Sequence, residues 1–101
     1  MSKEELIKKT IEHYDRMIEW AGKQDGESPV ARLLMHREIG ESWSAGDCLF
    51  CKVNTDCLDC FIAIKYNPSC EGTSWYQMES AKNWSWWLVH AKAMREEIRN
   101  L

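Results

Sequence analysis

The chain has 101 residues, of which 45% are apolar and 29% charged, and its formal net charge is −3 at pH 7. These values are typical of one soluble globular domain, and they exclude a disordered tail or a membrane-embedded protein. No apolar run is long enough to span a bilayer and the opening residues lack a signal peptide's apolar core, so we expect a cytoplasmic protein without membrane association. The negative balance argues against nucleic acid as a partner, because phosphate binding depends on clustered Lys and Arg.

Two helices are predicted in the first forty residues. The first extends from Lys3 to about Gly22, with a Ser2–Glu5 capping box, and its apolar residues recur at steps of three and four: Ile7, Ile11, Tyr14, Ile18 and Ala21, beside a second row of Leu6, His13, Met17 and Trp20. The second extends from Pro29 to about Ile39, with Ser28 as its N-cap and Gly40 as its stop. Its inward-facing residues are predicted to be Val30, Leu33 and Leu34.

From Glu41 to Thr73 the helical period disappears, and the spacing of the cysteines is the regular feature. Within this stretch Phe61–Ile64 are expected to form a short strand or an apolar turn. Ser74 and Gln77 then read as a second capping box, which predicts one long helix to the C-terminus. On that helix Trp84, Trp87 and Leu88 share one face and are expected to be buried, whereas Trp86 lies on the opposite side as a candidate partner-binding residue.

The five cysteines predict a metal site. They follow the pattern C-x2-C-x5-C-x2-C-x9-C, formed by Cys48, Cys51, Cys57, Cys60 and Cys70. Cytoplasmic thiols are kept reduced, so this pattern favours metal ligands over a disulfide framework. Two C-x2-C pairs supply the four thiolates that tetrahedral zinc accepts at about 2.3 Å, and a [4Fe-4S] cluster takes the same number.

The ligand set and the metal stay open at this point. One arrangement is a closed zinc site made by Cys48, Cys51, Cys57 and Cys60; a second is an iron–sulfur cluster that uses Cys70 in place of one of them; a third has no metal. His36 and His90 are weaker substitutes, because a lone histidine on a helix is more often a packed or solvated residue. The five-residue spacing between the pairs is shorter than the roughly 15 residues usual in zinc ribbons.

The order of the segments IEHYDRMIEWA, IGESWSAGDCLFCK, DCLDCFIAI and CEGTSWY, with a Trp-rich closing helix, resembles a group of small uncharacterised phage and prophage proteins. That group carries C-x-x-C, C-x-x-C-P-I and C-x-G-T-P-Y blocks in the same order. This chain departs from it at Phe61 and Ser74, where the group has proline, so local turn geometry differs. The resemblance implies a phage or bacterial source and a five-cysteine site, and it implies no activity.

Together these features predict a single domain over residues 1–101, mainly α-helical, in which two or three helices pack around an irregular metal-binding cysteine loop. No catalytic motif is present, so an enzyme is not predicted. The expected function is a structural zinc domain that binds a protein partner, with a homodimer as a further option. The alternative is an iron–sulfur protein in electron transfer or redox sensing.

Overall fold

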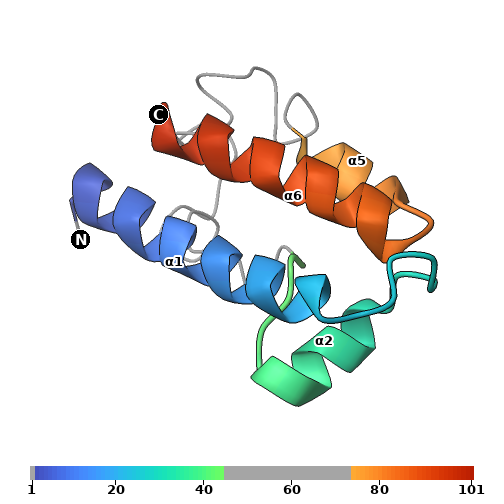
Figure 1. Cartoon of the computed structure of the whole chain (residues 1–101). Helices are drawn as coiled ribbons and strands as arrows, with labels where there is room; N and C mark the ends of the chain where they lie inside the picture. The colour runs from blue at the N-terminus through green and yellow to red at the C-terminus, as the bar shows by residue number, and fades with distance from the viewer. Residues whose placement is uncertain (1, 45–73) are drawn as a thin grey trace.

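Figure 1 shows a computed structural model of the chain, which describes residues 2–44 and 74–101. Four α-helices lie in these two ranges: α1 (Lys3–Gly22), α2 (Arg32–Ile39), α5 (Trp75–Ser80) and α6 (Trp84–Arg99). The predicted mainly helical fold is confirmed for this part of the chain, and no strand occurs in it. The Phe61–Ile64 segment and the cysteine loop lie outside the described residues, and the single-domain organisation stays a prediction.

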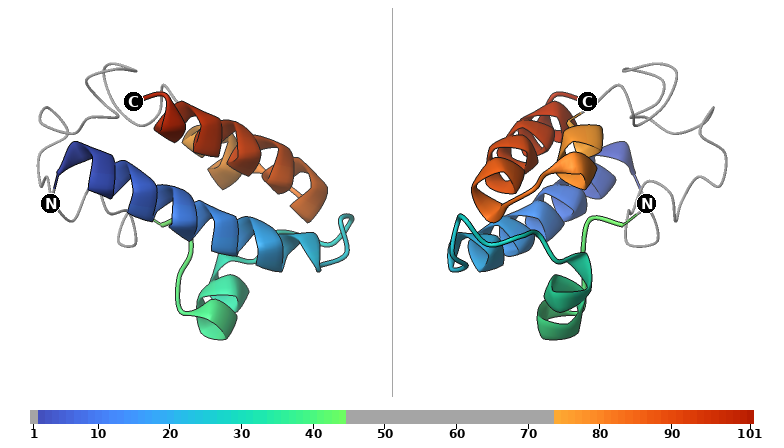
Figure 2. Two further views of the ribbon diagram at one scale, coloured as in Figure 1. Left: turned by 60° about the vertical axis from the view of Figure 1, so that its left-hand side comes forward. Right: turned by 90° about the vertical axis from the view of Figure 1, so that its right-hand side faces the viewer.

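The first and last helices form the main interface of the fold. In Figures 1 and 2, α1 and α6 lie side by side and run in opposite directions, while α5 packs along α6 and α2 projects from the far side of α1. The buried side chains that join these elements include two tryptophans and several methionines, and the most enclosed are Leu6, Met17, Met35, Met78, Trp84, Trp87 and Ile98. None of the described helices is long and apolar enough to cross a membrane.

The predicted start of helix α1 is confirmed, but its buried face differs from the predicted one. Ser2 Oγ accepts a hydrogen bond from the backbone N–H of Glu5 at 3.1 Å, as expected of an N-cap. The three isoleucines of the predicted inner row are only half-buried, and the deepest residues instead include Leu6, Met17 and the polar Thr10. The isoleucines therefore lie at the edge of the interface, because the centre of the buried stripe follows the second predicted row.

Helix α2 begins later than predicted. It starts at Arg32, after an extended Ala31, and Ser28 does not cap it. The physical reason is that the carbonyl of Ser28 accepts a hydrogen bond from the N–H of Trp84 at 3.2 Å, which draws this segment toward the start of α6. Leu33, predicted to face inward, is 84% exposed, and Met35 is the buried residue.

The predicted long C-terminal helix is wrong, because the chain turns at residues 81–83 and forms α5 and α6 instead. Asn83 makes the break: its side-chain oxygen accepts from the N–H of Trp86 at 2.9 Å and caps α6. The two preceding N–H groups, on Trp84 and Ser85, bond to the carbonyls of Ser28 and Gly26. All three donors at the start of α6 thus have partners without a preceding helical turn.

Candidate functional site

The five cysteines predicted as metal ligands, Cys48, Cys51, Cys57, Cys60 and Cys70, all lie outside the described residues. Within residues 2–44 and 74–101, no group of three or more His, Cys, Asp or Glu side chains gathers to hold a metal ion. His36 is exposed on α2, and His90 on α6 accepts a hydrogen bond from the Trp86 indole. The zinc and iron–sulfur assignments therefore stay predictions.

The two ends of the cysteine-containing segment are fixed to each other and to α6. On the described sides of this segment, the Trp75 indole N–H donates to the Trp43 carbonyl at 2.7 Å. Ser74 donates from its backbone N–H and its hydroxyl to the Glu97 carboxylate, at 2.9 and 2.6 Å. The two ends of the segment that carries the cysteines therefore lie next to each other, and contacts with the helices hold them there.

A third anchor ties the chain just before this segment to α1. Glu41 accepts a hydrogen bond at 2.7 Å from Nδ1 of His13, which is buried. Nε of Arg16 donates to both carboxylate oxygens of Glu41 at 3.0 and 3.1 Å. A carboxylate can only accept hydrogen bonds, so His13 presents a protonated Nδ1 to it. Sequence reasoning missed this contact, because 28 residues separate the two side chains.

Trp43 lies inside a cluster of tryptophans that packs the chain before the cysteine-containing segment against α1 and α6. Its ring centroid is 5.1 Å from that of Trp87 and 6.2 Å from that of Trp84, which also meets Trp20 edge-to-face at 5.3 Å. Such tilted and edge-to-face pairs are favoured by the ring quadrupoles. The predicted burial of Trp84 and Trp87 is confirmed, while Leu88 is half-buried.

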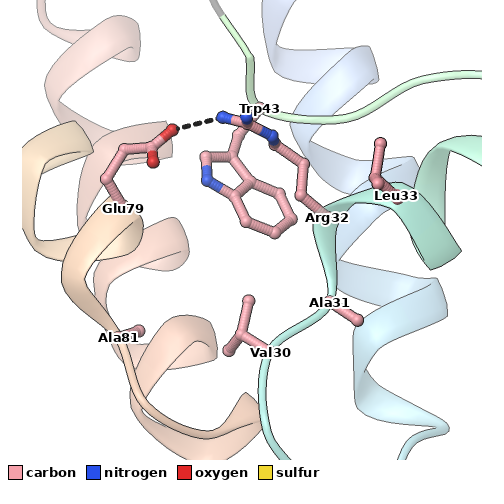
Figure 3. A pocket seen from close by; sticks show the side chains of 7 residues that line it. All are labelled: Val30, Ala31, Arg32, Leu33, Trp43, Glu79 and Ala81. Carbon is pink, nitrogen blue, oxygen red and sulfur yellow. Dashed lines mark hydrogen bonds and ion pairs between the residues drawn. The ribbon is translucent and has the colours of Figure 1, made fainter.

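Beside Trp43 is an open pocket of about 350 Å³ between the start of α2 and the end of α5 (Figure 3). Its lining is mixed, with apolar side chains beside the charged Arg32 and Glu79. An ion pair of 2.7 Å between Arg32 Nη1 and Glu79 Oε1 crosses it from α2 to α5. The indole nitrogen of Trp43 is shielded from solvent and has no hydrogen-bond partner in the described structure. A buried donor left unsatisfied costs about 1–3 kcal/mol, whereas a partly exposed ion pair contributes about 1 kcal/mol or less.

A second candidate surface lies on the outer side of α6. Trp86 is 50% exposed, as predicted for the face opposite Trp84 and Trp87, and Val89 is 63% exposed. Trp86 Nε1 donates to Nε2 of His90 one turn later, and the two rings lie 6.2 Å apart. Spacings of three and four residues place these side chains on one face of the helix. The result is a small aromatic and aliphatic surface, called here the α6 patch: Trp86, Val89 and His90.

Comparison of the chain with protein-family models, with curated proteins and with solved structures finds no match. The resemblance to phage and prophage proteins therefore stays a prediction.

Proposed function

We propose that this protein is a small metal-binding domain that acts by binding another protein, with the metal in a structural role. The observation that carries the proposal is the exposure of Trp86 on a helix whose other tryptophans, Trp84 and Trp87, are buried. Large aromatic side chains left in water are a frequent source of binding energy at protein interfaces, where Trp is enriched among the residues that matter most.

The metal half of the proposal depends on the cysteine pattern. Cys48, Cys51, Cys57 and Cys60 are the proposed zinc ligands, and Cys70 is the fifth candidate. The anchors at Trp43, Trp75 and Ser74 support it, because they bring the two ends of the segment together. Joined ends lower the entropic cost of bringing side chains that are distant in sequence to one ion.

The partner half depends on the α6 patch. Trp86 and Val89 offer apolar area, and the hydrogen bond to His90 fixes the position of the indole ring. An anchor that is already positioned loses less side-chain entropy on binding than a mobile one. We therefore propose that Trp86 inserts into an apolar pocket of a protein partner, in a bacterial cell or in a cell infected by a phage that encodes this protein.

The metal half is tested by anaerobic purification, an absorption spectrum and elemental analysis. About one zinc per chain without colour is the expected result for a four-thiolate site. A brown protein with about four irons per chain would instead establish the alternative, an iron–sulfur protein in electron transfer or redox sensing. Protein without bound metal would contradict both.

The partner half is tested by comparing Trp86→Ala with Tyr76→Ala in affinity capture. Tyr76 is the matched control, since it is an exposed aromatic residue on α5 and outside the α6 patch. Loss of an interface anchor of this kind costs about 2 kcal/mol or more, which is about thirtyfold in affinity. A partner captured equally by both variants would show that the α6 patch is not the binding surface.

A further inference from the structure

The hydrogen bond between Trp86 and His90 depends on the protonation state of the imidazole ring. Trp86 Nε1 can only donate, so Nε2 of His90 must accept, and the hydrogen of the neutral ring is then on Nδ1. An imidazolium ring carries a hydrogen on both nitrogens and accepts no hydrogen bond. The contact therefore requires neutral His90, and histidine is the side chain whose charge changes between about pH 5 and 8.

The surroundings of His90 offer a protonated ring no counter-charge. One turn away on α6 the side chains are uncharged: Trp86, Trp87, Ala93 and Met94. Helices α1 and α5 pack on α6, and the turn at residues 25–28 bonds to its start. Carboxylates on these elements and on α6 are paired elsewhere: Asp15 with Arg95, Glu79 with Arg32, Asp25 with the N–H of Glu27, and Glu97 with Ser74.

The basic side chain nearest to His90 in the sequence of α6 is that of Lys92, which is exposed and lies on another side of the helix. Within residues 2–44 and 74–101, His90 forms no ion pair. Protonation of His90 therefore adds an unpaired positive charge to the α6 patch and removes the acceptor of Trp86.

Loss of this contact changes Trp86 as a binding residue in two ways. The ring is half-exposed, so without its partner one turn away it regains rotamer freedom that binding must remove. Its N–H also lacks an acceptor, and an unsatisfied donor opposes burial in an apolar pocket. With His90 neutral, the ring enters such a pocket with its donor already satisfied, so the partner's pocket needs no acceptor for it.

We propose that His90 positions Trp86 for binding and does so only while it is neutral. Uptake of a solvent proton at Nε2 breaks the hydrogen bond and releases the ring, while the indole keeps its own hydrogen. The inference rests on the proposed protein-binding function of the α6 patch. It adds that the partner's pocket is apolar around the indole and that binding weakens in acid.

The test uses the full chain with ¹⁵N-labelled tryptophan and measures the order parameter of each indole N–H by NMR at about pH 8 and about pH 5. Trp86→Phe identifies the Trp86 signal by its loss. His90→Gln is the conservative variant, since its amide oxygen accepts a hydrogen bond at both pH values. His36→Gln, which removes an exposed histidine on α2, is the matched control. Trp84 is buried on the same helix and reports on folding.

In the unmodified chain and in His36→Gln, the order parameter of Trp86 should fall from about 0.85 to below about 0.6 at the lower pH. In His90→Gln it should be the same at both. An unchanged order parameter in the unmodified chain, an equal fall in His90→Gln, or a fall shared with Trp84 would overturn the inference.

The effect on binding is measured on the immobilised chain of the capture experiment. A step from about pH 8 to about pH 5 should release the captured protein from the unmodified chain and not from His90→Gln. Equal release from both chains would show that His90 does not control binding. An unchanged Trp86 ring leaves the comparison of Trp86→Ala with Tyr76→Ala intact, so the two proposals fail separately.

Discussion

The indole N–H of Trp75 donates a hydrogen bond of 2.7 Å to the main-chain carbonyl of Trp43, although the two residues are 32 positions apart. This contact joins the chain before the cysteine-containing segment to the chain after it. The partners are a side chain on α5 and a backbone group next to the pocket, so the bond also links α5 to the tryptophan cluster. Its loss should therefore affect both stability and metal binding.

Trp75→Phe tests this link, because it keeps an aromatic ring and removes the N–H. We expect the free energy of unfolding to fall by about 1–2 kcal/mol, since the part-buried Trp43 carbonyl loses its donor. Urea unfolding measures the loss, and competition with a chromophoric chelator should show weaker binding at the proposed zinc site. Tyr76→Phe is the control on the neighbouring residue; an equal response to both changes would argue against the link.

Glu41 should contribute more to stability through the buried His13 than through the exposed Arg16. In Glu41→Gln the partners His13 and Arg16 lose a charged acceptor, so we expect a loss of about 1–2 kcal/mol. Arg16 is 56% exposed, and Arg16→Gln should cost less than about 1 kcal/mol. Thermal unfolding of both variants gives the comparison. A larger effect in Arg16→Gln would show that the buried His13 contact is not the dominant one.

Gly26 approaches the side chain of Ser85 at the start of α6 closely. A Cβ at this position would lie 2.1 Å from Ser85 Oγ, so Gly26→Ala should force the hydroxyl out of its rotamer and destabilise the protein by about 1 kcal/mol. In the double variant Gly26→Ala/Ser85→Ala the nearest contact becomes the Ser85 Cβ at 3.4 Å, and much of the loss should be recovered. A double-mutant cycle by urea unfolding should give a coupling of about 1 kcal/mol. Additive effects would contradict the contact.

Gly22 and Gly40 end their helices differently, and alanine separates the two cases. Gly40 has φ 74°, a left-handed conformation that alanine adopts only at a cost, so Gly40→Ala should destabilise by about 1 kcal/mol. Gly22 is the last residue of α1, has no positive φ, and a Cβ there meets nothing within 4 Å. Gly22→Ala should therefore stabilise by about 0.5–1 kcal/mol. The midpoint of thermal unfolding should move in opposite directions.

The sequence predicted the helices where local signals decide the structure. Ser2 and Glu5 gave the start of α1, Gly40 the end of α2, and the spacing of Trp84, Trp86 and Trp87 separated buried from exposed rings. The same local rule failed at Ser74, whose side chain bonds Glu97 on the neighbouring helix and does not cap α5. The Ser74 hydroxyl donates to a distant carboxylate, whereas the capping box expects it to accept from the backbone N–H of Gln77.

The start of α6 could have been recognised from the sequence, because Asn83 is a favoured N-cap residue directly before an apolar run.

Other features depended on contacts that periodicity does not encode. Trp43 offered no such signal, because it lies in a segment without helical period, and its place in the tryptophan cluster depends on distant elements. Leu33 was predicted to face inward. In the structure α2 projects outward, and among its residues Met35 alone is buried.

The pairing of α1 with α6 has a consequence for how the chain folds. Asp15 and Arg95 form an ion pair of 2.7 Å between these helices, although 80 positions separate them in the sequence. Most helical domains fold quickly because their contacts are local, and non-local contacts slow the search by requiring closure of a long loop. Here each helix can form early, but α1 and α6 can pack together only after the chain between them has closed into a loop. A ligand that compacts that intervening chain in the unfolded state should therefore accelerate folding, and it stabilises the folded protein to the extent that it binds the folded state more tightly.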